Sequence, residues 1–165
     1  MRKVSSRAAH RGGGVLLALV LVILLAACGT VPADADGTSE RVRDGELRVG
    51  VTHNPPWTDT SADDPAGSEV ALMAAFAREL DARIDWMEGS EAVLADALRE
   101  GELDVAVGGF TQDTPWTDRA AVTTVYREVE NDRGVREKHV LLTRAGENRF
   151  LVTLEEFLGR AGDGG

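Results

Sequence analysis

The stretch that decides the fold is Glu102-Leu-Asp-Val-Ala-Val-Gly-Gly-Phe-Thr-Gln-Asp-Thr-Pro-Trp-Thr-Asp-Arg119. Its first part is typical of a buried strand, because apolar residues fill it and Gly108-Gly109 ends it. A polar loop follows, with two aromatic residues, hydroxyls, acids and a single cation. In open α/β sheets, ligands bind where buried parallel strands end in such loops. The stretch therefore predicts a ligand site, and the alternative is a solvent loop whose Trp116 packs into the core.

The first 27 residues have the features of a secretion signal. Four basic residues precede an unbroken apolar run, Val15 to Ala27, which is shorter than the roughly 20 residues of a membrane-spanning helix. The run ends in Leu-Ala-Ala-Cys28, and Cys28 is the only cysteine of the chain. This ending resembles the lipobox of bacterial lipoproteins, in which the cysteine is acylated and becomes the mature N-terminus. We therefore predict a lipoprotein signal peptide over residues 1–27 and lipidation at Cys28; the alternative is a free or buried thiol beside an ordinary cleavage site.

The charge of the mature part restricts its partners. Beyond residue 27 the chain carries 14 basic and 28 acidic residues. So acidic a protein is not expected to bind nucleic acid, or to bind anionic lipid electrostatically. Attachment to the membrane would then depend on the acyl chains at Cys28, which bind through buried methylene groups. With one cysteine, no disulfide can form within the chain, so stability must come from an ordinary core.

The remaining sequence divides into a tether, one domain and a short tail. Residues 28–44 are rich in small and polar types and are predicted to form a flexible tether. Residues 45–160 suffice for one hydrophobic core and not comfortably for two. Residues 161–165 are predicted to be a disordered tail.

The hydrophobic pattern of residues 45–160 predicts an α/β domain. Periodic apolar residues indicate helices that carry Phe76 and Leu94 inward, and a third helix near the C-terminus. Alternation of strands and helices with short links favours a mostly parallel sheet with flanking helices, in which the strand at Leu103 is central. The charged residues Arg127 to Lys138 are interpreted as a solvated connector. Strands are expected at about 47–51, 83–87, 103–107, 122–126 and 139–143.

Several segments, in their order and spacing, resemble the bacterial extracellular solute-binding proteins of family 3, the polar-amino-acid receptors of ABC importers. The resemblance implies one lobe of the periplasmic-binding-protein-like (type II) fold. Only the twelve residues Arg127 to Lys138 stand where that family has a second lobe, so the chain is identified as a one-lobed, truncated relative. The matching segments are Gly45-Glu-Leu-Arg-Val-Gly-Val51, Pro55-Pro-Trp57, Gly67-Ser-Glu-Val-Ala-Leu72 and Asp104-Val-Ala-Val-Gly-Gly-Phe-Thr111, followed by Arg119 and Tyr126.

The resemblance also implies roles for single residues. Arg119 resembles the arginine that pairs with a ligand carboxylate, and a planar guanidinium suits that task because it binds carboxylate bidentately. Thr111 would donate a hydrogen bond beside it, and Trp57 would cover one face of the ligand. Glu69 lies at a helix start near the site, where a capping role is an equal alternative to ligand contact.

Two further aromatic residues, Phe110 and Trp116, are expected on the open face of the site; for Trp116, plain packing is an even alternative. The spacing from Thr111 to Arg119 departs from the family pattern Thr-x-Thr-x-x-Arg by an apparent three-residue insertion. Arg119 is therefore also a candidate for local pairing with Asp113 or Asp118.

Three functions remain open. The first is a lipid-anchored, extracytoplasmic module that binds an amino-acid-like ligand weakly and serves an ABC permease or another membrane partner. The second is a one-lobed protein-interaction or sensor module that has lost ligand binding. The third is a periplasmic enzyme that uses His53, although the sequence favours a protein that is not an enzyme. No cofactor or metal is expected, a site of His53, Asp59 and Glu69 being disfavoured by its spacing, and homodimerisation is a possible way to cover the open face.

Overall fold

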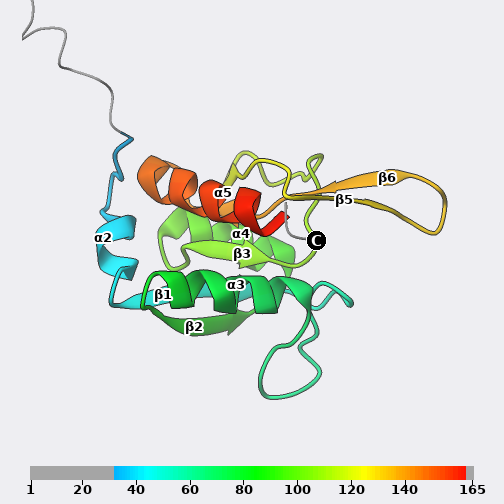
Figure 1. The fold of residues 1–165 in the computed structure, drawn as a ribbon, viewed down its shortest axis with the longest axis horizontal. Helices are drawn as coiled ribbons and strands as arrows, with labels where there is room; N and C mark the ends of the chain where they lie inside the picture. The colour runs from blue at the N-terminus through cyan, green and yellow to red at the C-terminus, as the bar shows by residue number, and fades with distance from the viewer. Residues whose placement is uncertain (1–31, 163–165) are drawn as a thin grey trace, which may run out of the picture. The chain divides into compact units, whose positions relative to one another are not determined.

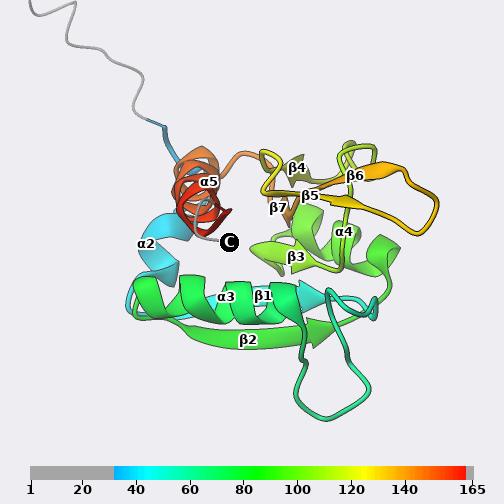
Figure 2. The same cartoon turned by 45° about the vertical axis from the view of Figure 1, so that its right-hand side comes forward.

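The structure is a computed structural model that describes residues 32–162 (Figures 1 and 2). The predicted signal peptide, the lipidation site Cys28 and the last three residues lie outside this range. Within it, no helix combines the length and apolar character that crossing a membrane requires. The elements are α2 (Thr38–Val42), β1 (Glu46–Val51), α3 (Ser68–Glu79), β2 (Arg83–Glu88), α4 (Glu91–Glu100), β3 (Val105–Val107), β4 (Ala121–Val122), β5 (Arg127–Glu130), β6 (Arg136–His139), β7 (Leu142–Thr143) and α5 (Asn148–Gly162).

The main sheet has five strands in the order β2-β1-β3-β7-β4. Strand β1 pairs in parallel with β2 and with β3, while β7 runs antiparallel to both β3 and β4. The predicted α/β class is therefore confirmed, and β3 is the central strand as expected. The carboxyl ends of β1 and β3 lie side by side, which brings the loops after Val51 and Val107 to one edge of the sheet.

Helices cover both faces of this sheet. Side chains alternate between the two faces of a strand, so Val49 and Val105 enter one core with α3 and α5, while Ala106 enters another with α4. Phe76 of α3 and Leu94 of α4 are fully buried in these two cores, as predicted. The two cores hold the sheet between its helices. The candidate site lies at the edge of the sheet where the loops after β1 and β3 begin.

The predicted flexible tether is wrong for its second half. Residues 38–42 form α2, whose Val42 is fully buried among side chains of α3 and α5. The carboxylate of Glu147, just before α5, accepts hydrogen bonds from the backbone N–H groups of Asp36 and Thr38 at 2.8 and 2.9 Å. Asp34 accepts one from Phe150 N–H at 2.9 Å in return. These hydrogen bonds pair backbone N–H groups at the N-termini of both α2 and α5, which have no partner within their own helix. They hold the segment against α5.

The expected solvated connector is also wrong, because residues 127–139 form a β-hairpin. Strands β5 and β6 pair antiparallel from Arg127↔His139 to Glu130↔Arg136 and make a sheet of their own. The hairpin projects away from the other elements in Figure 1. Of the strand expected at 122–126, only Val122 lies in a strand, β4, and the strand expected at 139–143 is divided between the end of β6 at His139 and β7. The expected tail is helical at Ala161 and Gly162, where α5 continues.

Candidate functional site

Two glycines shape the edge of the sheet where β1 and β3 end. A Cβ atom on Gly108 would lie 2.1 Å from the Thr52 side chain, and one on Gly109 would lie 2.5 Å from the Trp57 ring. Gly109 also has a left-handed backbone, with a φ of 70°, which favours glycine. Side chains at these positions would push the two loops apart, so the glycines let the loop after β1 close onto the loop after β3.

The carboxylate of Glu69 joins the two loops to the start of α3. Glu69 is 1% exposed. Its Oε2 accepts hydrogen bonds from the backbone N–H groups of Gly108 and Gly109 at 2.7 and 2.9 Å, and its Oε1 accepts one from the Tyr126 hydroxyl at 2.5 Å. Charge-assisted bonds of this kind offset the cost of burying a carboxylate. In this structure Glu69 therefore positions the site, with both of its carboxylate oxygens already accepting hydrogen bonds.

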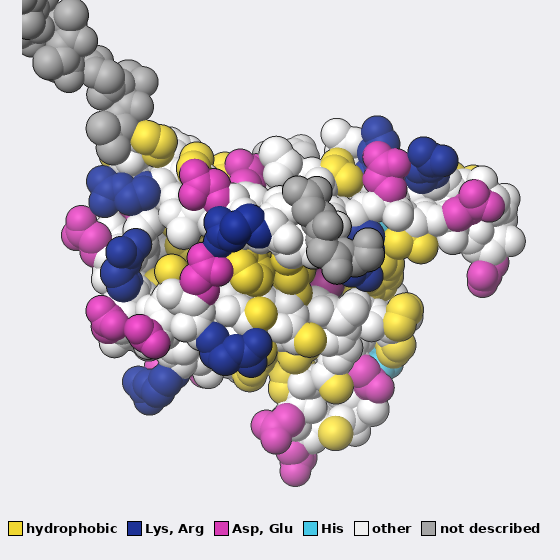
Figure 3. Space-filling view, viewed as in Figure 1, with side chains coloured by type: hydrophobic (Ala, Val, Ile, Leu, Met, Phe, Trp, Pro, Cys, Tyr) yellow, Lys and Arg dark blue, Asp and Glu magenta, His cyan; other side chains and the backbone are white. Residues whose placement is uncertain are grey.

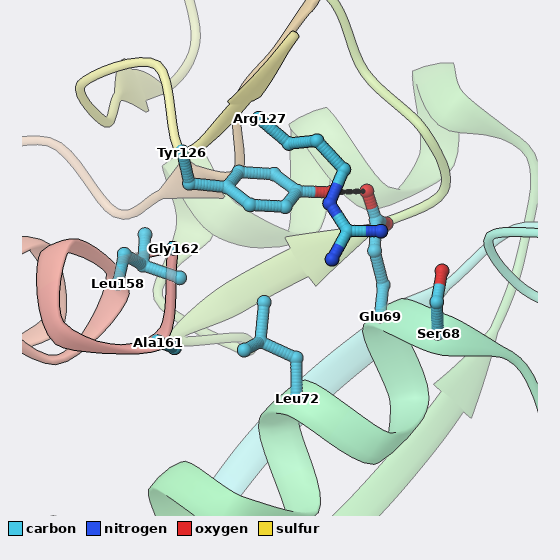
Figure 4. A pocket seen from close by; sticks show the side chains of 8 residues that line it. All are labelled: Ser68, Glu69, Leu72, Tyr126, Arg127, Leu158, Ala161 and Gly162. Carbon is cyan, nitrogen blue, oxygen red and sulfur yellow. Dashed lines mark hydrogen bonds between the residues drawn. The ribbon is translucent and has the colours of Figure 1, made fainter. Parts of the chain in front are cut away.

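The bond from Tyr126 to Glu69 is seen in Figure 4. Burial, together with the negative charge of Glu69, raises the pKa of Tyr126 well above its ordinary value. The phenol therefore keeps its proton and remains a donor to Glu69. Leu72 and Leu158 are among the residues that line the small cavity beside this pair (Figure 4). Its volume is about 40 Å³, far below the roughly 300–1,000 Å³ of ligand pockets.

Trp57 lies at the same edge, but one face of its ring is already in contact with another side chain. Its ring packs on the ring of His139, with centroids 3.9 Å apart and an interplanar angle of 35°. His139 is 1% exposed, and it forms an isolated β-bridge with Thr111. The Thr111 hydroxyl donates to Asp113 at 2.8 Å, and this bond lowers the pKa of Asp113. The structure thus brings Trp57, Thr111 and Glu69 to one edge, as the sequence predicted, and adds His139.

Trp116 and Arg119 lie on the α4 side of the loop. The indole N–H of Trp116 donates to Glu91 at 2.9 Å, and the Arg119 guanidinium lies over the Trp116 ring, 5.2 Å from its centroid. Arg119 also pairs with Asp96 of α4 at 3.2 Å and, at 3.8 Å, with Asp118. Of the two local partners considered for Arg119, the structure selects Asp118, and it adds Asp96.

Counted from Thr111, the family pattern Thr-x-Thr-x-x-Arg places its arginine at Trp116. Contact of either Trp116 or Arg119 with a ligand therefore stays a prediction. Phe110, expected on the open face, is instead 4% exposed and belongs to the core beside α4.

A wider groove lies between the Thr111–Asp113 loop and β6. It has a volume of about 490 Å³ and is lined on one side by Thr111 and Asp113 and on the other by residues 135–138. The backbone N–H of Gln112 donates to Lys138 O at 2.8 Å and so joins the loop to β6. The groove has the size of a ligand site but exposed walls, and Glu137 from β6 is one of its polar groups.

His53, the residue of the enzyme hypothesis, lies in the loop after β1. Its side chain is 52% exposed, and Nδ1 lies 3.7 Å from an Asp59 carboxylate oxygen. Nδ1 also accepts a hydrogen bond from the backbone N–H of Thr60 at 3.2 Å. Glu69 is committed to Tyr126 and the two glycines, and among residues 32–162 no group of three or more metal-ligating side chains is found.

The sequence profile of the bacterial extracellular solute-binding proteins, family 3, matches residues 47–163. The chain belongs to this family. The resemblance deduced from the sequence is thereby confirmed, and its single lobe fits a truncated member. Residues 47–163 include every residue of the candidate site, so the geometry above is that of a family 3 lobe.

Curated relatives place the family 3 lobe within larger proteins. The chain is 36% identical over 99 residues to membrane-bound lytic murein transglycosylase F 2 of Alkalilimnicola ehrlichii, covering 58% of this chain and 22% of the relative. It is 27% identical over 157 residues to membrane-bound lytic murein transglycosylase F of a Shewanella species, covering 88% of this chain and 32% of the relative. These relatives are enzymes by name, which contradicts the expectation of a protein that is not an enzyme. The chain spans about a fifth to a third of their length.

Solved structures show the same fold. The arginine-bound domain 1 of TmArgBP superposes with a TM-score of 0.63 at 21% identity, covering 78% of this chain and 99% of that one. A putative ABC-transporter binding component of Wolinella succinogenes, complexed with lysine, superposes with a TM-score of 0.64 at 14% identity, covering 73% of this chain and 91% of that one. At such identities the likeness concerns the fold, and it agrees with a single lobe.

Proposed function

We propose that this protein is a lipid-anchored, extracytoplasmic solute-binding lobe that recognises an amino-acid-like ligand for an ABC-type transport system. The observation that carries the proposal is the edge where β1 and β3 end. Glu69 holds the Gly108-Gly109 turn there, the Trp57 ring packs on His139, and Thr111 forms a β-bridge with His139. Ligands of open α/β sheets bind outside the carboxyl ends of the strands, and membership of family 3 supports the same location.

The ligand would bind on an open surface. The small cavity at Tyr126 is too small for an amino acid, while the groove beside Thr111 has exposed walls. Ligand pockets usually bury about 70–90% of a ligand's surface. Binding by this lobe alone is therefore weak, and a membrane partner or a second copy of the chain would be needed to cover the face.

Calorimetry with the twenty amino acids, preceded by a thermal-shift screen, tests the ligand class. Trp57→Leu is expected to weaken binding tenfold or more, because it removes the aromatic surface at the site. Trp86→Leu is the matched control, since Trp86 lies in β2 and packs against the core on the α3 side. Trp116→Leu shows whether the second tryptophan contributes. Equal losses for Trp57→Leu and Trp86→Leu would contradict the location.

Membrane attachment is tested at Cys28. Cys28→Ser removes the thiol that the lipobox offers for acylation, and two acyl signals give stable anchoring where one is marginal. The variant is expected to be released from membranes or to stay as an uncleaved precursor. A mature-sized serine variant that fractionates with membranes would contradict the anchor.

The curated relatives support a second candidate, a role in murein cleavage. They are named as lytic murein transglycosylases, and this chain matches a part of each. The test is release of soluble fragments from purified murein by the full chain. His53→Ala is the variant to compare, because His53 beside Asp59 is the half-exposed titratable pair of the enzyme hypothesis. Absence of release would reject lytic activity for the chain on its own.

A further inference from the structure

Hairpin β5–β6 is a two-stranded sheet that projects from the other elements (Figures 1 and 2). A two-stranded hairpin is only marginally stable in water by itself, and a third strand or a packing partner usually stabilises it. The outer edge of such a sheet is a row of unpaired N–H and C=O groups, which can pair with another strand. The two edges of this hairpin differ in how far the chain itself already covers them.

The directions of the backbone groups of β6 follow from its hydrogen bonds. Beside the turn, the N–H of Asn131 donates to Val135 O at 2.9 Å across the hairpin. In an antiparallel ladder, hydrogen-bonded pairs alternate with pairs that are not hydrogen-bonded. With the register of this hairpin, the backbone groups of Arg136 and Lys138 therefore point away from β5. The bond from Gln112 N–H to Lys138 O agrees with this direction.

The loop after β3 already pairs with the base of this outward edge. Thr111 and His139 form an antiparallel β-bridge, and Gln112 bonds to Lys138 beside it. The loop then turns, because the N–H of Thr114 donates back to Thr111 O at 2.9 Å. A short third strand thus begins at the hairpin base and stops after Gln112.

Beyond that point the edge of β6 is free. The N–H and C=O groups of Arg136 and the N–H of Lys138 have no backbone partner among residues 32–162. The groove of about 490 Å³ lies along this edge, with Asp113 on one side and residues 135–138 on the other. A strand added in the groove would continue the line of the loop and run antiparallel to β6.

The charges on the free edge determine which strand would fit. Arg136 and Lys138 are exposed and, being two positions apart, project from the same face of β6. The exposed ion pair of Arg136 with Glu128, at 3.5 Å, uses a single guanidinium nitrogen. A carboxylate opposite Arg136 on an added strand would also lie diagonal to Lys138, and opposite charges in such cross-strand positions are favourable. The edge therefore suits an acidic strand.

A second copy of the chain does not fit this edge. In an antiparallel pair of β6 strands, outward-pointing residues face one another, so every symmetric register sets Arg136 and Lys138 against cations. A symmetric pair of β5 strands would likewise set Glu128 and Glu130 against acids, and like charges directly opposite each other are destabilising. Pairing of β5 with β6 of another copy is blocked where Gln112 already bonds to Lys138.

We propose that the free edge of β6 is a docking site for an extended, acidic segment of a partner protein, which joins the hairpin as a third strand antiparallel to β6. The backbone of Arg136 would supply the main-chain hydrogen bonds, and the two cations on this face would select the charge. Recognition by strand addition relies on such main-chain bonds for affinity and on side-chain positions for specificity. The proposal goes beyond the solute-binding function, because it does not depend on a small ligand.

The test uses two dye-labelled peptides, Thr-Val-Glu-Val-Thr and Thr-Val-Lys-Val-Thr, with blocked ends. Their binding to the full chain in detergent is followed by fluorescence anisotropy. The wild type is expected to bind the glutamate peptide at least about tenfold more tightly, because attraction to two cations replaces repulsion. Arg136→Glu should reverse this preference. Arg133→Glu is the matched control: it reverses the same charge in the hairpin turn, outside β6, and should change neither affinity by more than about twofold.

Arg136→Pro tests the main-chain bonds separately from the charge. Proline removes the outward N–H, and it is tolerated on an edge strand whose N–H faces solvent. Arg136→Ala is its reference, since alanine removes the same charge and keeps the N–H. The proline variant should bind the glutamate peptide at least about tenfold more weakly than the alanine variant. Backbone chemical shifts of β5 should show that both variants keep the hairpin.

The outcomes are distinct from those that test the solute-binding lobe. Equal binding of the two peptides by the wild type, equal binding by Arg136→Pro and Arg136→Ala, or an equal loss in Arg133→Glu would overturn strand addition at this edge. If the wild type binds neither peptide, the cations only keep other strands away from the edge, and the proposal is wrong. Calorimetry with amino acids tests the lobe independently of each of these results.

Discussion

Among single residues, Glu69 determines most of the geometry of the site. A buried carboxylate is tolerated when each oxygen accepts charge-assisted hydrogen bonds, and Glu69 accepts three. Its position in the first turn of α3 adds the favourable interaction of a negative charge with a helix N-terminus. Since its donors come from the turn after β3 and from Tyr126, one side chain ties three distant segments together.

Glu69→Leu is predicted to lower the free energy of unfolding by about 2–5 kcal/mol, because it leaves buried backbone donors of Gly108 and Gly109 unpaired. Glu69→Gln should cost about 1 kcal/mol, since its carbonyl can accept from the glycines and its amide can donate to the Tyr126 oxygen. Thermal and urea unfolding measure the loss of unfolding free energy in both variants.

Glu91→Leu is the control for this series. Glu91 also lies in the first turn of a helix, α4, but it is exposed and accepts a single bond from Trp116. Its loss should cost about 1 kcal/mol or less. Similar losses for Glu69→Leu and Glu91→Leu would show that Glu69 does not organise the site.

The sequence predicted part of this site and could not predict the rest. Recognisable strands and helices adjoin Trp57, Glu69 and Thr111. The position of these three residues at one edge of the sheet could therefore be predicted from the topology. The hydrogen bond from Tyr126 to Glu69 joins residues that are 57 positions apart, and no local sequence pattern predicts it. The burial of His139 depends on the ring of Trp57 folding over it. Arg119 is held by Asp96 because α4 packs beside the loop, which the spacing alone does not reveal.

Among the elements, predictability followed the strength of the hydrophobic pattern. Helices α3 and α4 and strand β1 have periodic apolar faces, and their burial is decided within each segment. The hairpin β5–β6 has no apolar alternation, and its exposed strands are joined by a turn at residues 131–135 in which Gly134 has a φ of 73°. Helix α2 has five residues and is fixed by Glu147, which is 109 residues away from Thr38. Such contacts are tertiary and leave little trace in local sequence.

The junction of α2 and α5 should weaken in acid. Burial alone would raise the pKa of Asp34. Hydrogen bonds from Ser39 and Phe150 outweigh this effect and hold the pKa of Asp34 below its ordinary value of 3.8. A depressed carboxyl pKa contributes stability that is present above the unfolded-state pKa and is lost as the pH falls through the folded-state pKa. The difference in unfolding free energy between wild type and Asp34→Asn should therefore be constant from about pH 5 to pH 7 and shrink below about pH 4. A difference independent of pH down to pH 2 would contradict this role for the charge.

The hairpin is predicted to exchange its amide hydrogens much faster than the central sheet. All four residues of β5 are exposed, whereas Val105, Ala106 and Val107 of β3 are fully buried, and segments with few buried contacts open locally at low free energy. Hydrogen exchange followed by mass spectrometry should show β5 and β6 exchanging at least about tenfold faster than β1 and β3. Protection equal to that of the sheet in the isolated chain would indicate that a partner or a second copy covers the hairpin. Added ligand should slow exchange at its base, near His139, before its tip.

At the scale of the whole molecule, the single lobe limits the affinity for a small solute. High affinity requires that most of the ligand's surface is buried, and near the candidate site the described residues offer a cavity of about 40 Å³ at Tyr126 and an exposed groove beside Thr111. An ion pair on such an open face behaves like a surface pair, worth at most about 1 kcal/mol. The monomeric protein is therefore predicted to bind free amino acids with a dissociation constant on the order of millimolar.

Calorimetry combined with light scattering on the same sample decides this point, since it gives the affinity and the mass of the binding species together. Binding that tightens with protein concentration while the mass doubles would show that a second copy covers the face. A strictly monomeric protein with micromolar or better affinity would contradict the prediction, because the lobe would then have to close over the ligand by itself, and the projecting hairpin is the element placed to do so. A protein that stays monomeric and binds no amino acid would instead favour a protein-interaction or sensor module, in which the edge formed by Trp57 and the hairpin contacts a macromolecule at the membrane.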